Sequence, residues 1–238
     1  MGMQVKAEEH TMQTMKIERL DKMNIHRNEA YKTLRTNIEF TGERVKVISI
    51  TSCIPDEGKS NVAMNLSVSL AENGKKVLLI DADMRKSTMA GHFKIKNMKK
   101  GLSHFLSGQC EKEEIMGETN IDGMHMILAG AIPPNPSELL SEEKFAAFLK
   151  EMREVYDYII IDCPPLGSVI DALIPGKLSD GVALVVETEN VSYKMVQRIK
   201  KQLETAECRI LGVILNKVNI KGSIYYKNYY SGCYTSEE

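Results

Sequence analysis

The stretch VKVISITSCIPDEGKSNVAMNLSVSLAE, residues 45–72, is the most informative part of this chain. It opens with a short run of β-branched apolar residues, continues through a loop that ends in Gly-Lys-Ser, and then places apolar residues at helical spacing. A strand, a tight loop and a helix in this order are the context that a phosphate-binding loop requires. The stretch therefore predicts an α/β fold built around such a loop.

The residue types of the loop suit the binding of a polyphosphate. Backbone N–H groups at a helix N-terminus are unpaired and lie at the positive end of the helix dipole, so they attract phosphate oxygens. Gly58 lets the backbone approach the phosphates, Lys59 can reach the β- and γ-phosphate oxygens, and Ser60 offers a hydroxyl group to Mg²⁺. The predicted nucleotide-binding residues of the loop are Asp56, Glu57, Gly58, Lys59, Ser60 and Asn61.

One position of the loop departs from the usual motif. The fuller pattern has a glycine five residues before Gly58, whereas this chain has Cys53 there. The sequence leaves open how closely the first turn of the loop approaches a nucleotide. The alternative is that an ordinary connection between a strand and a helix contains Gly-Lys-Ser by chance. The residues downstream argue against this alternative.

Two further apolar runs end in carboxylates. KVLLIDADMR (76–85) contains Asp81 and Asp83, and YDYIIIDCPP (156–165) carries Asp162 before a Pro-Pro break. Because ligands of open α/β sheets bind at the carboxyl ends of the strands, we expect these side chains near the phosphates. An Asp placed like Asp162 holds Mg²⁺ directly or through water. Asp81 and Asp83 are alternate residues and should share a face, although one of them could instead cap a turn.

Composition narrows the class of protein. With 238 residues, 43% of them apolar, the chain is most simply one α/β domain with tails. A formal net charge of −1 gives no global basic field, so we expect no nucleic-acid partner. Five cysteines without a C-x-x-C pair and without a secretory signal indicate a reducing cytoplasm. No apolar run approaches the roughly 20 residues that span a bilayer, which predicts a soluble chain.

Strand-like and helix-like segments alternate along the chain. This alternation predicts a P-loop NTPase fold, with a mainly parallel sheet and helices on both faces. We expect helices near 28–39, 102–106, 111–116, 169–177 and 192–205, and one from an N-cap at Ser137 to about residue 153. Strands are expected near 124–128, 181–187 and 209–216. The expected parts are an arm at 1–27, loosely held or forming an accessory helix, a nucleotide-binding domain at 28–216, and a flexible tail at 217–238.

The expected helix at 28–39 has an apolar face formed by Ala30, Tyr31, Leu34 and Ile38. Glu29, Lys32 and Arg35 follow one another at three-residue spacing on another face. Such a charged row is usually a solvated face, and a subunit contact is the functional alternative.

The C-terminal tail is rich in tyrosine. It holds five of the nine tyrosines of the chain, which are Tyr225, Tyr226, Tyr229, Tyr230 and Tyr234. No hydrophobic periodicity surrounds them, so the sequence predicts neither a helix nor a strand there.

These motifs together resemble those of a known family. Gly58-Lys59-Ser60, LIDADMRK (79–86), PPNPSELL (133–140), IIDCPP (160–165) and the tyrosine-rich end are similar to those of the bacterial tyrosine kinases of capsular and exopolysaccharide synthesis, in the form where the cytoplasmic kinase is a separate polypeptide. The resemblance covers nearly the whole chain from residue 29 onward. It implies an ATP- and Mg²⁺-dependent autokinase that phosphorylates the tail tyrosines of a neighbouring subunit.

The resemblance also assigns roles by matching position. Lys59 and Ser60 would grip the β/γ-phosphates and Mg²⁺, with Asp83 and Asp162 supporting the metal. Asp81 would accept the proton of the tyrosine. Arg85 and the neighbouring Lys86 would set the phosphate or substrate side.

Assembly and partners are implied in the same way. The family's Glu-x-x-Arg-x-x-Arg helix, which builds ring-like homo-oligomers, is similar to Glu29-x-x-Lys32-x-x-Arg35. Lys32 cannot make the bidentate fork of an arginine, which weakens the expected contact. Members of the separate form act with a membrane-inserted activator whose cytoplasmic end completes the site, which would recruit the chain to the inner face of the cell membrane. A tyrosine phosphatase would reset the cycle.

Two alternative functions are kept open. A Min/Par-type ATPase switch shares the sheet and the aspartates, but it carries an additional lysine early in the loop, where this chain has Ser52, Cys53 and Ile54. The other alternative function is that of a catalytically silent adaptor that is gated by nucleotide. Asn216 resembles the residue that meets adenine in related ATPases, and a strand-end turn explains it equally well.

Overall fold

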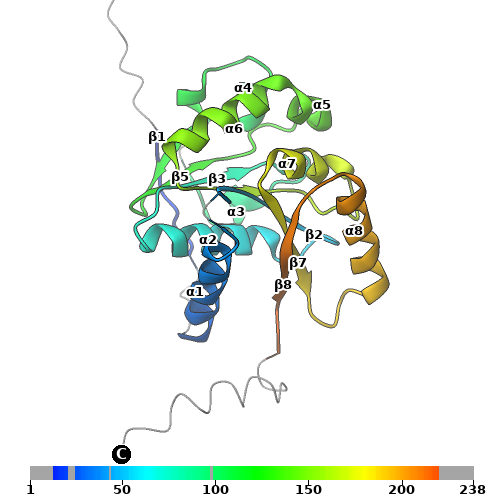
Figure 1. Ribbon diagram of the computed structural model, residues 1–238. Helices are drawn as coiled ribbons and strands as arrows, with labels where there is room; N and C mark the ends of the chain where they lie inside the picture. Colours follow the sequence, from blue (N-terminus) through cyan, green and yellow to red (C-terminus); the bar gives the residue numbers. More distant parts are fainter. Residues whose placement is uncertain (1–12, 21–24, 43, 97–98, 220–238) are drawn as a thin grey trace, which may run out of the picture.

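A central sheet organises the computed structural model, which describes residues 13–20, 25–42, 44–96 and 99–219. Its strand order is β1-β4-β5-β3-β6-β2-β7-β8 (Figure 1). Within the described residues, neighbouring strands run parallel except for β4 with β5. The strands are β1 (Gln13–Met15), β2 (Val47–Ser52), β3 (Val77–Asp81), β4 (Gly117–Thr119), β5 (Met124–Ile127), β6 (Tyr158–Asp162), β7 (Gly181–Glu187) and β8 (Ile210–Asn216).

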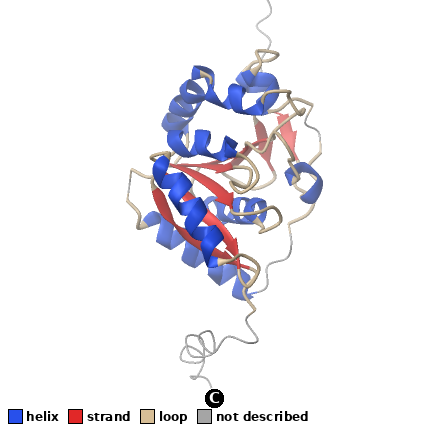
Figure 2. Cartoon of the chain, turned by 90° about the vertical axis from the view of Figure 1, so that its right-hand side faces the viewer, coloured by secondary structure: helices blue, strands red, loops and turns tan. Residues whose placement is uncertain are grey.

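Helices cover both faces of the sheet, as the sequence predicts (Figure 2). The first face carries α1 (Ile25–Glu39), α2 (Lys59–Glu72) and α3 (Met89–His92). The second carries α4 (Leu102–Leu106), α5 (Pro136–Ser141), α6 (Glu143–Val155), α7 (Leu173–Leu178) and α8 (Tyr193–Thr205), with 3₁₀ turns η1 (Lys112–Glu114) and η2 (Ile170–Ala172). No helix in the described part of the chain is long and apolar enough to cross a membrane.

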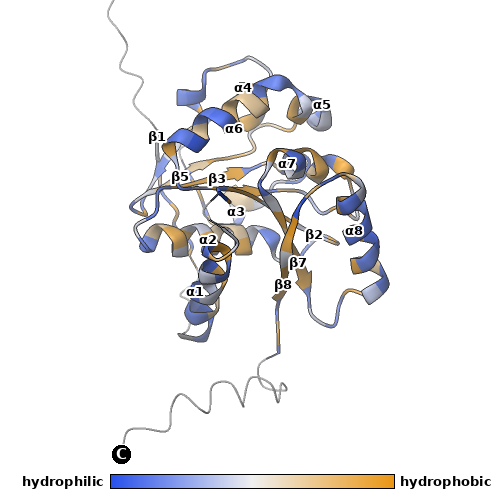
Figure 3. Cartoon of the chain, in the orientation of Figure 1, coloured by the Kyte–Doolittle hydropathy of each residue, from blue (hydrophilic) through white to orange (hydrophobic). Residues whose placement is uncertain are grey.

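The central strands are buried on both faces, which explains their continuous apolar sequences. Along β3, Leu78 and Ile80 pack into the core beneath α6 and α8, whereas Val77 and Leu79 pack into the core beneath α1 and α2. The strands are correspondingly apolar along their length, and the helices show polar residues on their outer faces (Figure 3). The carboxyl ends of β2, β3 and β6 therefore meet at one edge of the sheet, and the apolar cores on both faces hold these strands in place.

The N-terminal region differs from the expected arm. Residues 13–15 form an edge strand that pairs in parallel with β4, and both Met15 and Ile17 are buried. A side chain at Gly117 would collide with Met15, so the glycine makes room for this strand. The predictions of a loosely held arm and of an accessory helix are both wrong for this segment. A three-residue strand is too short to show the alternation of apolar and polar residues that would have predicted it. The first helix also begins at Ile25, inside the expected arm.

Four other expectations need correction. The helix expected from Ser137 to about residue 153 is two helices, because Glu142 adopts an extended conformation with φ −65° and ψ 146°. The N-cap position of α5 is Asn135, and Ser137 lies inside that helix. The helix expected at 111–116 is only a 3₁₀ turn, and Ala30 is exposed although Tyr31, Leu34 and Ile38 are at least partly buried.

Candidate active site

The phosphate-binding loop ends at Gly58, which takes the N-cap position of α2 in the left-handed region, with φ 86° and ψ 21°. A side chain at this position would also collide with the amide of Asn216. Glycine is therefore required by both the backbone conformation and the close approach of β8. The first amides of α2 lie beyond Gly58 with no partner inside the helix, which is the arrangement that binds phosphate.

Glu57 holds the loop from within. Its carboxylate is buried and accepts hydrogen bonds from the backbone N–H groups of Ile54 (2.7 Å) and Glu187 (2.9 Å). The sequence placed Glu57 among the nucleotide-binding residues, but its side chain faces the interior. Its contribution is to fix the loop against the end of β7.

The end of β8 supports the same loop from the other side. The Asn216 side chain donates to the backbone oxygen of Glu57 (2.8 Å), and the Lys217 amino group donates to that of Asp56 (2.7 Å). Lys217 also forms an ion pair with Glu187 (2.9 Å). Sequence reasoning missed Lys217 and Glu187, because their partners lie more than a hundred residues away or in a neighbouring strand. Asn216 thus has a structural contact in addition to its expected role near the base.

Cys53 does not need to be glycine in this loop. It is absent from the described residues that have a positive φ, and its side chain is buried in the core. Burial, assisted by the nearby Glu57 carboxylate, raises the pKa of the Cys53 thiol to about 12. The departure from the usual motif is therefore accommodated by packing, and the thiol is inert.

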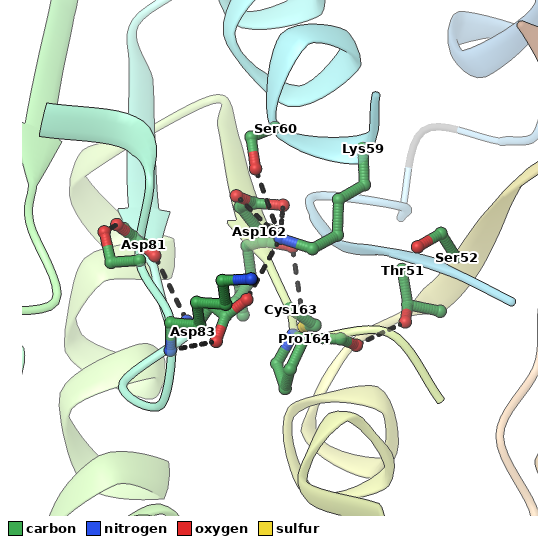
Figure 4. Close-up of polar contacts among 12 residues, drawn as sticks. Thr51, Ser52, Lys59, Ser60, Asp81, Asp83, Asp162, Cys163 and Pro164 are labelled. Atoms are coloured by element: carbon green, nitrogen blue, oxygen red, sulfur yellow. Dashed lines mark hydrogen bonds and ion pairs between the residues drawn. The ribbon is translucent and has the colours of Figure 1, made fainter. Parts of the chain in front are cut away.

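Four predicted residues meet at the carboxyl ends of the strands (Figure 4). The Lys59 ammonium nitrogen lies 3.3 Å from Asp162 Oδ1 and 3.3 Å from Asp83 Oδ2. It also lies 3.1 Å from the Ser60 hydroxyl oxygen. The structure thus brings Lys59, Ser60, Asp83 and Asp162 into one cluster. We call these four residues, together with Asp81, the acidic cluster.

The electrostatics of the acidic cluster are unbalanced. Burial opposes the charge of Lys59, but Asp162 and Asp83 outweigh it and raise the pKa of the ammonium group above its usual value. Burial raises the pKa of Asp162 as well. Burial, followed by the charge of Asp162, raises the pKa of Asp81 to about 7. The cluster holds three carboxyl groups and one ammonium group, and this excess of carboxyl groups favours the arrival of further positive charge.

The donor set fits Mg²⁺ that arrives with a nucleotide. Hydroxyl and carboxylate oxygens of Ser60, Asp83 and Asp162 are the ligand types that Mg²⁺ prefers. Among the described residues, no group of three or more His, Cys, Asp or Glu side chains is arranged to hold a metal by itself. Mg²⁺ in nucleotide sites keeps waters and phosphate oxygens as ligands, so one or two protein carboxylates suffice.

Asp81 and Asp83 do not share a face as the sequence suggested. The strand β3 ends at Asp81, and the chain turns at Asp83, where the backbone N–H of Met84 donates to the backbone oxygen of Ala82 (3.0 Å). Asp81 Oδ1 accepts the backbone N–H of Asp83 (3.1 Å), and Oδ2 accepts the Ser87 hydroxyl (2.5 Å). Figure 4 shows Asp81 on the far side of Asp83 from Lys59. The two aspartates therefore have different surroundings, with Asp83 facing Lys59 and Asp81 facing Ser87.

Arg85 is held by residues that sequence reasoning missed. Its Nε and Nη2 donate to the two oxygens of Asp171, at 2.6 Å and 3.2 Å. Nη2 also donates to the Ser137 hydroxyl oxygen (3.2 Å). Lys86 is attached through its backbone N–H, which donates to Asp83 Oδ1 (3.0 Å). A polar Asp171 inside an otherwise apolar stretch was the one available signal.

The residues expected to mediate assembly separate into two groups. Glu29 and Lys32 form an exposed ion pair on α1 (2.8 Å). Arg35 instead donates to the backbone oxygen of Ser69 on α2 (2.8 Å), which ties the two helices together. The five tail tyrosines lie outside the described residues.

Comparisons with known proteins show which proteins this chain is similar to. A family model described as an AAA domain matches residues 45–226. Tyrosine-protein kinase CpsD of Streptococcus agalactiae is 41% identical over 203 residues, which cover 84% of this chain and 89% of that protein. The crystal structure of the chimerical protein CapA2B2 superposes with a TM-score of 0.78 at 33% identity, covering 87% of this chain and 95% of that one. The kinase domain of the Escherichia coli tyrosine kinase ETK gives 0.79 at 34% identity, covering 84% and 79%.

A cell-division ATPase shows the same fold at lower similarity. The septum site-determining protein MinD of Pyrococcus horikoshii, solved with Mg-ADP, gives a TM-score of 0.61 at 27% identity, covering 71% of this chain and 69% of that one. The P-loop NTPase fold predicted from the sequence is confirmed, and this fold binds nucleotides. The higher similarity to tyrosine kinases favours that class over the Min/Par ATPases.

Proposed function

Since the chain belongs to the bacterial tyrosine-protein kinase family, we propose that it transfers the γ-phosphoryl group of Mg-ATP to tyrosines of a neighbouring copy and thereby regulates capsular or exopolysaccharide synthesis. One observation carries the proposal. The loop lysine, Lys59, lies between two buried carboxylates, Asp83 and Asp162, at the N-terminus of α2. That arrangement supports phosphoryl transfer, because it groups a cation with carboxylate oxygens of the kind that Mg²⁺ prefers, beside a helix N-terminus that can bind phosphate.

The residues divide the work of phosphoryl transfer. The amides that follow Gly58 and the ammonium group of Lys59 take the phosphates, which requires Lys59 to exchange its carboxylate partners for phosphate oxygens. Ser60, Asp83 and Asp162 would hold Mg²⁺, which neutralises charge on the β- and γ-oxygens when bound. Without the nucleotide, the Lys59 ion pairs keep the cluster folded and partly neutral.

The function is tested by one assay with purified components. The chain is mixed with the cytoplasmic end of a CapA-like partner and Mg-ATP, and phosphotyrosine is followed by immunoblot and mass spectrometry. A kinase gains phosphate on tyrosine. A Min/Par-type switch hydrolyses ATP without gaining it, and a silent adaptor binds nucleotide and does neither. Either of the last two outcomes contradicts the proposed function.

Asp81 is proposed as the proton acceptor for the tyrosine hydroxyl. Such a hydroxyl has a pKa near 10, so its attack benefits from a positioned base. Among the described residues, the Asp81 carboxylate accepts hydrogen bonds from Ser87 and from the backbone N–H of Asp83 and forms no ion pair with Lys59, which supports a role apart from metal binding.

We expect Asp81→Asn to keep the affinity for Mg-ADP and to lower phosphotransfer about 10²- to 10⁴-fold. The amide retains the shape of the carboxylate and cannot take the proton. Fluorescent nucleotide titration and initial phosphorylation rates measure the two quantities. If nucleotide affinity falls by the same factor as the rate, Asp81 belongs to the metal site instead.

The similarity to the CapA2B2 chimera supports a CapA-like activator as the partner of this chain. We propose that the activator is inserted in the membrane and that it recruits the kinase to the inner, cytoplasmic face. Assembly into a ring-like homo-oligomer is proposed through the exposed Glu29–Lys32 side of α1.

Replacing Glu29, Lys32 and Arg35 with Ala is expected to give monomers, because the first two side chains are exposed and available to a neighbour. Light scattering in the presence of the activator fragment measures the mass. Arg35→Ala alone is the control, since it loosens α1 from Ser69 within one subunit and should lower Tm without dissociating the oligomer. A monomeric wild type under these conditions contradicts the interface.

A further inference from the structure

Arg85 is fixed by a carboxylate that comes from a distant part of the chain. The Asp171 side chain is 2% exposed, and it holds Arg85 through two hydrogen bonds of 2.6 Å and 3.2 Å. It also accepts the Ser137 hydroxyl (2.7 Å). A bidentate contact of this kind fixes the plane of a guanidinium group and not only its position.

Three separate segments meet at this contact. Arg85 lies in the loop after β3, Ser137 in α5 and Asp171 in η2. The same loop is anchored at Asp83, whose Oδ1 accepts the backbone N–H of Lys86 (3.0 Å). The segment from Asp83 to Lys86 is therefore held at one side by the acidic cluster and at the other by Asp171.

The contact leaves part of the guanidinium group available. Nε and Nη2 donate to Asp171 and Ser137, whereas Nη1 donates no hydrogen bond within the described residues. The Arg85 side chain is 44% exposed while its partner is almost fully buried. An arginine fixed along one edge presents the remaining N–H groups in a defined direction, which suits the oxygens of a phosphoryl group.

We infer that Asp171 is a positioning residue that, with Ser137, aims the free edge of Arg85 at the phosphoryl group in transfer. The inference rests on the proposed kinase function. Without Asp171, the long arginine side chain would sample many rotamers in solvent, and a small misplacement of a charged group can cost about 100-fold in rate. The buried carboxylate itself has no access to the substrate and acts through Arg85.

A double-mutant cycle tests the inference. Asp171→Asn and Arg85→Ala are made singly and together, and kcat, KM for ATP and Mg-ADP affinity are measured with the activator present. We expect Asp171→Asn to lower kcat roughly 10- to 100-fold with little change in Mg-ADP affinity. In the Arg85→Ala background, Asp171→Asn should cause no further loss of kcat. Independent, multiplicative losses would show that Asp171 does not act through Arg85 and would overturn the inference.

Asp180→Asn is the matched control. Asp180 receives a bidentate contact from Arg153 (2.9 Å for both hydrogen bonds) at the amino ends of β2 and β7, away from the acidic cluster. Asp180→Asn should lower Tm and leave kcat unchanged. Asp171→Asn should lower kcat, and its effect on Tm should be too small to account for that loss. Equal behaviour of the two variants would indicate a purely structural Asp171.

Ser137→Ala keeps the inference testable if Asp171→Asn does not fold. It removes one of the two partners of Asp171 and leaves the carboxylate paired with Arg85. A several-fold lower kcat that disappears in the Arg85→Ala background supports the inference, and an unchanged kcat contradicts it. A wild type without tyrosine phosphorylation would instead contradict the proposed function itself, so the two failures are distinguishable.

Discussion

Lys59→Met is expected to lower tyrosine phosphorylation at least about 100-fold, which is the loss typical of removing one group that stabilises the charge of a transition state. Lys59 is the only cation shown in contact with Asp83 and Asp162 among the described residues. Methionine has a similar length and no charge, so it fills the space without attracting phosphate. Initial rates of phosphotyrosine formation measure the effect.

The same substitution also removes the counter-ion of the acidic cluster. A buried charge that loses its partner destabilises a protein, so the variant should be less stable without nucleotide than the wild type. Circular dichroism and urea unfolding therefore accompany the rate measurement. Lys200→Met is the control, because Lys200 forms only an exposed ion pair with Glu204 (2.6 Å) on α8. Undiminished activity in folded Lys59→Met would remove the loop lysine from the mechanism.

Sequence reasoning succeeds where the information is local. The strand, loop and helix from Val47 to Glu72 and the carboxylates at the ends of β3 and β6 were predictable from hydrophobic runs and their terminal residues. Parallel strands then dictate that these ends meet at one edge of the sheet. The cluster of Lys59, Asp83 and Asp162 follows from topology without any knowledge of distances.

Residues whose roles depend on distant partners were not predictable. The Glu57 carboxylate accepts the N–H of Glu187, which lies 130 residues further along the chain. Arg85 and Asp171 are 86 residues apart. No local period encodes such contacts. Ser137 was expected to cap a helix because serine often does so, but in the fold its hydroxyl bonds to Asp171.

The edge strand β1 shows a different limit. It has three residues and takes its stability from pairing with β4 and from burial of Met15. Both interactions are tertiary. A segment of this length has no pattern of its own, so the sequence could indicate only that residues 1–27 differ from the rest.

Replacing Tyr225, Tyr226, Tyr229, Tyr230 and Tyr234 with Phe is expected to remove most of the phosphate that the wild type incorporates. Phenylalanine keeps the ring and lacks the hydroxyl that accepts the phosphoryl group. Mg-ADP affinity should not change, because every residue of the acidic cluster is retained. Mass spectrometry of the phosphorylated wild type and of the variant measures the distribution of phosphate.

The described tyrosines provide the control for this experiment. Tyr156 is 2% exposed, and its hydroxyl lies 2.6 Å from His125 Nδ1, so a kinase site cannot reach it in the folded chain. Tyr193 is 76% exposed at the start of α8. Tyr193→Phe should therefore leave the incorporated phosphate unchanged. Phosphate found mainly on Tyr193, or on the half-buried Tyr31 and Tyr158, would show that the tail is not the substrate.

We expect the charge of the acidic cluster to make the tail a switch as well as a substrate. Each phosphorylation adds about −1.5 to −2 charges at neutral pH, so several of them make the tail strongly anionic. The buried carboxylates of Asp81, Asp83 and Asp162 should repel such a tail once the phosphoryl group has been transferred. Repulsion between neighbouring phosphorylated tails should also loosen the ring, and a tyrosine phosphatase would then be needed to restore it. The five-fold Phe variant should accordingly stay assembled after incubation with Mg-ATP while the wild type dissociates, and equal masses by light scattering would contradict this cycle.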